Sequence, residues 1–123
     1  MKRRITVRSA KNKGKSLQNK VCEKISELTG IPWGSEDEML IQSRQMGQKG
    51  CDVILRGKAL ERFPYSIECK SAQKINLWAA IDQAKANQKK DTDWLVVLKR
   101  KEIKSPVVCL DINVFFNLLK KES

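Results

Sequence analysis

The spacing of apolar residues along the chain alternates between a helical period and a strand period. From Leu17 to Leu28 apolar residues recur every three or four positions, and Gly30 then interrupts the pattern, which predicts an amphipathic helix over about residues 16–29. Apolar runs bounded by glycine, proline and polar residues predict strands elsewhere. The further elements that these patterns predict are strands over about 39–44, 51–55, 65–69, 94–98 and 107–110, and helices over about 76–88 and 112–121.

The order of these elements is helix, three strands, helix, two strands and helix (α-β-β-β-α-β-β-α), which predicts an α/β fold with a mixed β-sheet flanked by helices. The connection between residues 51–55 and 65–69 contains Gly57 and Pro64 and suits an antiparallel pair. The continuous apolar run at 94–98 is typical of a strand that is covered on both faces. With 123 residues the chain is long enough for one hydrophobic core, so we expect a single domain.

Positive charge indicates a polyanionic partner for this domain. The sequence has 25 lysine and arginine residues against 14 acidic ones, a formal net charge of +11, and such a field attracts nucleic acid. Because the N-terminal stretch lacks apolar periodicity and contains Gly14, we expect residues 1–15 to form a flexible basic arm and residues 16–123 to form the domain. The arm carries seven basic side chains and no acid: Lys2, Arg3, Arg4, Arg8, Lys11, Lys13 and Lys15.

Several classes of protein and site are not expected from this composition. No run of about 18 apolar residues is present and the N-terminus is basic and polar, so we expect no membrane span and no export, and hence a cytoplasmic, intracellular location. The sequence has no histidine, and its four cysteines lack paired spacing, so we expect no zinc site. We interpret the cysteines as small buried hydrophobic residues.

Asp52, Glu68 and Lys70 are the candidate chemical groups. In a strand, Glu68 and Lys70 point to one face, and antiparallel pairing of the strand that Asp52 opens could bring a second carboxylate beside Glu68. Two carboxylates, phosphate oxygens and waters form an oxygen site that suits Mg²⁺ or Mn²⁺. One of two adjacent carboxyl groups should also have a raised pKa until an ion binds. Taken alone, the Glu-Cys-Lys triplet is more typical of an exposed ion pair on a sheet face.

A longer pattern surrounds these groups. Residues 47–54 (GQKGCDVI) and 63–70 (FPYSIECK) are followed by a helix that bears Gln83. This pattern resembles the PD-(D/E)XK nuclease superfamily, and within it the phage-type relatives of the Holliday-junction resolvases. The resemblance implies a restriction-endonuclease-like core, metal-dependent hydrolysis of DNA phosphodiesters on branched DNA such as Holliday junctions, Mg²⁺ as cofactor with Mn²⁺ as a substitute, and a homodimer.

The resemblance also implies roles for single residues. Asp52 and Glu68 correspond to metal ligands and Lys70 to the catalytic lysine. Resolvase-like relatives commonly place a Glu after Lys-Gly on the first helix, where this chain has Gln18, which could coordinate through its carbonyl oxygen; Glu23 is the weaker candidate. Gln83 corresponds to a polar helix position that often faces the site, although an ordinary exposed glutamine would have the same pattern.

Further polar and basic residues precede the strand that begins at Asp52, and we expect them to contact DNA phosphates together with the basic arm. Two other functions remain open at this point. One is a noncatalytic nucleic-acid-binding module on a nuclease fold, which the glutamine on the first helix favours. The other is an endonuclease that nicks DNA or cuts a specific duplex site. The expected phosphate contacts before the strand are Ser43, Arg44, Gln45 and Lys49.

Overall fold

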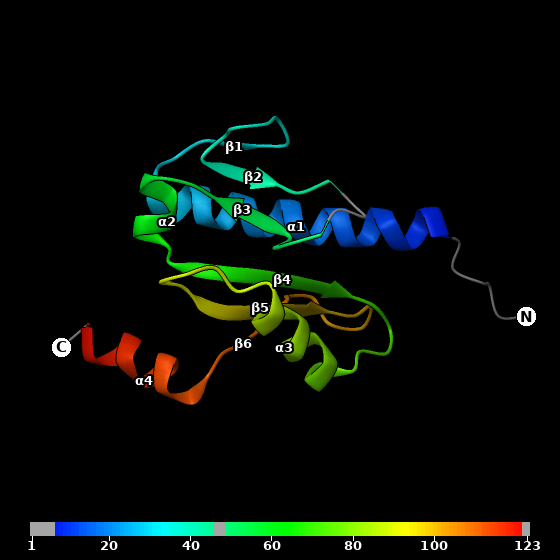
Figure 1. The fold of residues 1–123 in the computed structure, drawn as a ribbon. Coiled ribbons are helices and arrows are strands. Elements are labelled where there is room, and N and C mark those ends of the chain that lie inside the picture. The colour runs from blue at the N-terminus through cyan, green and yellow to red at the C-terminus, as the bar shows by residue number, and fades with distance from the viewer. Residues whose placement is uncertain (1–6, 46–48, 122–123) are drawn as a thin grey trace, which may run out of the picture.

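A six-stranded mixed β-sheet lies at the centre of the computed structural model, which describes residues 7–45 and 49–121, with residues 7–11 described by backbone alone (Figure 1). The strands are β1 (Trp33–Gly34), β2 (Ile41–Ser43), β3 (Val53–Leu55), β4 (Tyr65–Ser71), β5 (Asp93–Lys99) and β6 (Val107–Cys109). The helices are α1 (Val7–Thr29), α2 (Lys58–Arg62), α3 (Leu77–Ala86) and α4 (Ile112–Lys121).

The strands lie in the sheet in the order in which they occur along the chain. β1 and β2 are parallel, β2, β3 and β4 are antiparallel neighbours, β4 and β5 are parallel, and β6 is antiparallel to β5. Helix α3 makes the crossover that a parallel β4–β5 pair requires. The expected α/β class, the mixed sheet with flanking helices and the antiparallel β3–β4 pair are therefore confirmed. The sequence patterns missed β1 and α2, which are too short to show a period.

Two helices cover opposite faces of the sheet and divide the core into two parts. On one face α1 packs on side chains that include Ile67 and Val97, and on the other α3 packs on Val96 through small residues such as Ala80 and Ala84. Successive residues of a strand point to opposite faces. Consequently β4 directs Ile67 toward α1, and Glu68, which pairs with Val96, toward α3.

Helix α1 begins at Val7, so the expected boundary of a flexible arm at residue 15 is wrong for residues 7–15. Gly14 does not end the helix, because a helical glycine costs only about 1 kcal/mol relative to alanine and the buried face of the same helix offsets it. The expected arm residues 1–6 lie outside the described part of the chain. Despite its length, α1 is too polar to cross a membrane, and within the described ranges no other helix is long and apolar enough to do so.

The buried face of α1 excludes Leu28, which the apolar spacing placed on it. Cys22 and Ile25 are buried against the sheet, whereas Leu28 is 72% exposed. Thr29 takes the next buried position of the helical period, and its hydroxyl donates a hydrogen bond of 2.8 Å to the carbonyl of Ile25. All four cysteines are free; Cys22 and Cys51 are buried and the other two are half-buried.

Replacing Ile25 by alanine should lower the free energy of unfolding by about 2–5 kcal/mol, because it removes a buried side chain that the sheet cannot fully close over. Leu28→Ala, on the same helix, should change it by less than about 0.5 kcal/mol, because that side chain is already in solvent. Urea denaturation of both variants and the wild type gives the comparison. Equal destabilisation by the two substitutions would contradict the observed orientation of α1.

Candidate functional site

Asp52 and Glu68 lie opposite each other at the point where β3 and β4 separate. The two antiparallel strands pair at Val53 and Ile67, so the next position in the same register sets Asp52 beside Glu68. Regular pairing ends there: the backbone N–H of Asp52 still donates to the carbonyl of Ile67 at 3.0 Å, but no further residue of the β3 segment pairs with β4. The sheet thus opens at these two carboxyl groups.

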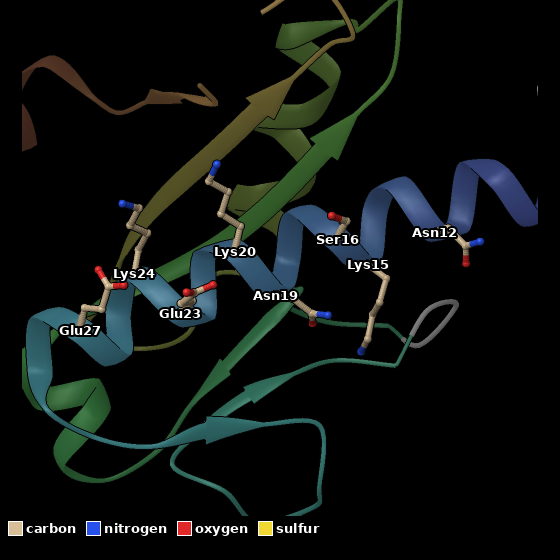
Figure 2. A pocket seen from close by; sticks show the side chains of 8 residues that line it. All are labelled: Asn12, Lys15, Ser16, Asn19, Lys20, Glu23, Lys24 and Glu27. Atoms are coloured by element: carbon tan, nitrogen blue, oxygen red, sulfur yellow. The ribbon is translucent and has the colours of Figure 1, made fainter. Parts of the chain in front are cut away.

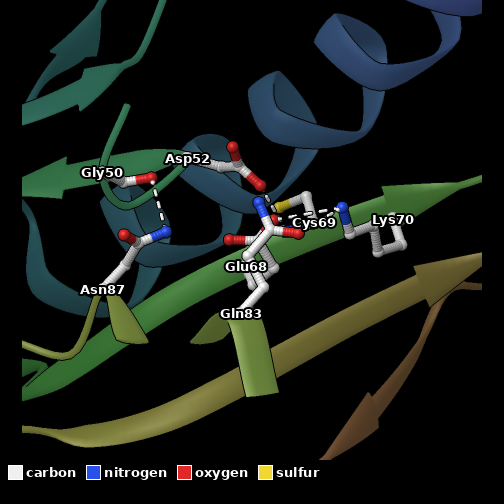
Figure 3. A network of polar contacts seen from close by, with 7 residues as sticks. All are labelled: Gly50, Asp52, Glu68, Cys69, Lys70, Gln83 and Asn87. Atoms are coloured by element: carbon white, nitrogen blue, oxygen red, sulfur yellow. Dashed lines mark hydrogen bonds and ion pairs between the residues drawn. The ribbon is translucent and has the colours of Figure 1, made fainter. Parts of the chain in front are cut away.

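A backbone hydrogen bond fixes the Asp52 carboxylate in this opening. Its Oδ2 accepts the N–H of Cys69 at 2.7 Å (Figure 3), and its own carbonyl accepts the N–H of Arg44 at 2.9 Å. The carboxylate oxygen therefore takes the place of a carbonyl from a neighbouring strand. A half-buried carboxylate held in this way has little freedom to turn toward solvent.

Glu68 is the buried member of the pair, with 2% of its surface exposed. Its Oε1 lies 3.4 Å from Nζ of Lys70. Its Oε2 is also buried, and no donor group among the described residues reaches it. A proton shared with Asp52 would let the two carboxyl groups hydrogen-bond each other. Buried polar oxygens nearly always have a partner, so Oε2 marks a place where a further positively charged or hydrogen-bonding group fits.

Helix α3 completes the site from the other side. Nζ of Lys70 donates a 2.8 Å hydrogen bond to Oε1 of Gln83, and Figure 3 shows both side chains converging with Glu68. Gln83 is exposed to solvent, and this contact brings its side chain to Lys70; its role in a site stays a prediction. Ala80 and Ala84, on the same helix, are buried against the sheet, and their small size permits the close approach that brings Gln83 to Lys70.

Burial opposes ionisation of both carboxyl groups, and the charge of Asp52 further opposes ionisation of Glu68. Burial, followed by the nearby charge of Asp52, raises the pKa of Glu68 from 4.5 to about 7, although Lys70 opposes the shift. The pKa of Asp52 is also raised, first by burial, against the lowering effect of the Cys69 N–H. The sequence predicted one raised pKa from like charge; both pKa values are raised here, and burial is the larger cause. Near neutral pH the pair retains a proton unless a cation replaces it.

The donors at this site fit a hard divalent cation. Asp52 and Glu68 supply carboxylate oxygens, and no donor group among the described residues reaches one of these, the buried Oε2 of Glu68. Oxygen donors suit Mg²⁺ and Mn²⁺, which usually keep several waters and take only one or two carboxylates from the protein. Across residues 7–45 and 49–121, no third histidine, cysteine, aspartate or glutamate joins the pair. The remaining ligands would have to be water, substrate oxygens or a neutral side chain.

The two expected candidates for a further ligand lie in different places on α1. Gln18 is buried, and its Oε1 accepts a 3.3 Å hydrogen bond from the hydroxyl of Ser43, the last residue of β2. Its role in metal binding stays a prediction. Glu23 is exposed, and the structure does not bring it to Asp52 and Glu68. Figure 2 shows it in a surface pocket of about 720 Å³ along α1, lined by Asn12, Lys15, Ser16, Asn19, Lys20, Glu23, Lys24 and Glu27.

The residues expected to contact DNA differ in their exposure to solvent. Lys13, Gln45 and Lys49 are exposed, as DNA contacts must be. Ser43 is 1% exposed and its hydroxyl bonds to Gln18, so this side chain is not available to a phosphate and the expectation is corrected. The side chains of Arg3, Arg4, Arg8 and Lys11 lie outside the described residues.

Two of the basic residues expected to contact DNA, Lys15 and Arg44, instead hydrogen-bond to the backbone of the loop that leads to Asp52. Lys15 donates from α1 to the carbonyls of Ser43 at 3.4 Å and Arg44 at 3.2 Å. Arg44 donates to the carbonyl of Cys51, and it packs so closely over Gly50 that a Cβ there would lie 2.7 Å from a guanidinium nitrogen. Gly50 has φ +114°, a conformation that other residues rarely adopt. These contacts fix the start of the segment that carries the carboxylate.

Asn87 is a structural residue of the site that sequence patterns did not indicate. It follows α3, donates through Nδ2 to the carbonyl of Gly50 at 3.4 Å (Figure 3), and accepts the thiol of Cys51 at its own carbonyl, at 3.3 Å. It therefore ties the end of α3 to the turn before Asp52. An asparagine just after a helical pattern signals a helix end, but gives no sign of a partner so distant in sequence.

Comparison of this chain with protein-family models, with curated proteins and with solved structures gave no match. The interpretation of the site consequently depends on its geometry and on the motif that surrounds Asp52 and Glu68. That geometry comprises two adjacent carboxyl groups, a lysine held by one of them and by Gln83, and a buried oxygen that no donor group of the described residues reaches.

The raised pKa of Glu68 gives a pH-dependent test. Folding raises this pKa above 4.5, so the stabilisation that comes with protonation is complete below pH 4.5 and is lost as the pH rises through about 7. Without metal, Glu68→Gln should therefore be more stable than the wild type at pH 8, by about 1–3 kcal/mol, and the difference should disappear below pH 4.5. Chemical denaturation across this pH range measures it.

Adding Mg²⁺ at pH 8 should raise the melting temperature of the wild type more than that of Glu68→Gln, because an ion that binds only the folded state stabilises it. Glu61→Gln is the matched control, since Glu61 is an exposed carboxylate on α2. A stability difference between wild type and Glu68→Gln that does not vary with pH would contradict the burial of an ionisable pair.

Proposed function

We propose that this protein is a divalent-metal-dependent endodeoxyribonuclease with a restriction-endonuclease-like core, which hydrolyses phosphodiester bonds in branched DNA such as Holliday junctions. The observation that carries the proposal is the buried carboxyl pair of Asp52 and Glu68, in which no donor group among the described residues reaches Oε2 of Glu68, on a chain with a net charge of +11. The antiparallel β2–β3–β4 unit, followed by α3 and the parallel strand β5, suits such a core. The resemblance of residues 47–54 and 63–70 to PD-(D/E)XK motifs supports it further.

In this proposal each residue of the site has a separate task. Asp52 and Glu68 hold the cation, and when bound the cation supplies positive charge that polarises a phosphodiester. Lys70, held between Glu68 and Gln83, directs its ammonium to the same place, where it can hydrogen-bond a water or offset negative charge that develops on a phosphate oxygen. Gln83 positions the lysine and does not itself react.

Charge and exposure support DNA as the substrate. Exposed basic side chains such as Lys13 and Lys49 lie on α1 and on the segment that leads to Asp52. Contacts of this kind add affinity for phosphate without reading base sequence. A preference for junctions over nicked or linear duplex is part of the proposal through the resemblance to resolvases, and a comparison of these substrates tests it.

A second candidate function is a DNA-binding module that does not cleave. The observation that favours it is Gln18, a neutral side chain, at the position where resolvase-like relatives commonly have a carboxylate, together with the lack of a third acidic ligand among the described residues. The module would retain the fold and the basic surface. The two functions differ in whether the wild type cuts any DNA when Mg²⁺ or Mn²⁺ is present.

Cleavage should require Mg²⁺ or Mn²⁺ and should fall by at least about a hundredfold in Asp52→Asn, Glu68→Gln and Lys70→Ala. The first two substitutions remove a ligand charge and should also weaken metal binding. Lys70→Ala removes a charge near the phosphate and should leave metal binding nearly intact. Single-turnover cleavage of a four-way junction, a nicked duplex, a linear duplex and a single strand, each with metal and with chelator, measures the activity, and calorimetric titration of Mg²⁺ into DNA-bound protein measures the affinity.

The matched controls are Glu61→Gln and Lys104→Ala, which alter an exposed carboxylate and an exposed lysine away from the site. Both should cut and bind DNA like the wild type. Cleavage that survives the chelator, or folded site variants that cut at the wild-type rate, would overturn the assignment. A wild type that binds DNA but cuts none of the four substrates would establish the noncatalytic module instead.

A further inference from the structure

Helix α4 is amphipathic, yet it buries no side chain in its own domain. Most of its apolar residues recur at helical spacing and form one face. Phe115 and Phe116 contact each other edge to face, with ring centroids 5.3 Å apart. This α4 surface consists of Ile112, Phe115, Phe116, Leu118 and Leu119, which are each between 41% and 67% exposed.

The orientation of α4 is the reverse of what a surface helix normally adopts. A pocket of about 480 Å³ separates α4 from the end of α3 and the start of β5, and Asn113, Val114 and Asn117 line it on the side of α4. Val114 is the only half-buried residue within α4. The asparagines thus face the domain and the apolar face points away from it. An amphipathic helix is stable in this orientation when its apolar face is covered by another surface.

We propose that the α4 surface binds a second copy of this chain, with the two α4 helices antiparallel about a twofold axis. Large side chains that are about half exposed contribute on the order of 100 Å² each, so the five together offer on the order of 500 Å². With the surrounding polar rim this approaches the roughly 600 Å² per partner at which specific interfaces begin. The absence of charge among the five residues suits the core of a homodimer interface.

The charges at the two ends of α4 favour the antiparallel arrangement. Asp111 precedes the helix and its Oδ1 accepts the N–H of Asn113 at 2.8 Å, while Lys121 ends the helix and is exposed. A twofold axis through the middle of the surface brings the acidic end of one helix near the basic end of the other. The contact is therefore self-complementary, as a twofold interface must be. A parallel arrangement would instead place like charges together.

The remainder of the printed sequence offers no other cover for this surface. The segments outside the described residues are 1–6, 46–48 and 122–123, and each is too short and too polar to cover five large apolar side chains. The residues of α4 that line the pocket toward the rest of the domain are two asparagines and Val114. A second copy presents a surface of matching size and chemistry. This inference does not depend on the proposed nuclease activity.

Sedimentation velocity across a range of protein concentrations should show a reversible dimer of the wild type. Phe116→Asp should weaken dimerisation by at least about tenfold, because it sets a charge in the centre of the contact. The fold should not change, since Phe116 is 53% exposed and α4 has no fully buried residue. Trp78→Asp is the matched control: Trp78 is 74% exposed on α3, and its replacement should leave the dimer intact. Lys121→Asp should weaken the dimer a fewfold.

Hydrogen exchange of the wild type provides a second measurement that needs no variant. Amides of α4 should become more protected as protein concentration rises, and those of α1 should not. A wild type that stays monomeric at every concentration would overturn the proposal, and binding of that monomer to anionic lipid vesicles would assign the surface to a membrane. A dimer that Phe116→Asp leaves unchanged would place the interface elsewhere. A dimer unaffected by Lys121→Asp would contradict the antiparallel arrangement.

Discussion

Two carboxyl groups face each other on neighbouring strands where little water reaches them, and the chemistry of the site depends on this contact. Asp52 cannot turn away because its Oδ2 is bonded to the Cys69 N–H, and Glu68 is buried on the face of the sheet against which α3 packs. Lys70 offsets part of the charge, but no donor group in the described part of the chain reaches the second oxygen of Glu68. Burial of the pair favours a bound proton, and in the proposed function a cation takes the place of that proton when pH and metal concentration allow.

Burial of two carboxyl groups is unfavourable, and apolar packing on both faces of the sheet stabilises the fold against it. Buried side chains between α1 and the sheet fix β3 and β4 on one face, and alanines of α3 cover the other. Asn87 ties the end of α3 to Gly50, so helix and loop hold Asp52 from both sides. Helix α4 takes no part in this packing. Its apolar face is therefore free for association, and changes there need not disturb the carboxyl pair.

Periodicity predicted the elements that build the site, because a strand long enough to alternate places Glu68 and Lys70 on one face and antiparallel pairing adds Asp52. The predicted start of α1 was wrong. Dense positive charge and Gly14 weaken the helical pattern of the sequence there, whereas tertiary packing stabilises the helix. Helix α2 is too short to show a period. The burial of Glu68 and the contact from Asn87 to Gly50 arise from residues far apart in sequence, so no local pattern could indicate them.

We propose that Asp52 and Glu68 together hold a divalent cation, and the position of the ion tests this directly. Anomalous diffraction from crystals grown with Mn²⁺ near pH 8 locates the ion without reference to activity. We expect a strong anomalous peak between the two carboxylates, close to Oε2 of Glu68, and no such peak in crystals of Glu68→Gln grown in the same way. A peak that persists in Glu68→Gln, or one found only at the exposed acidic residues 36–38, would contradict it.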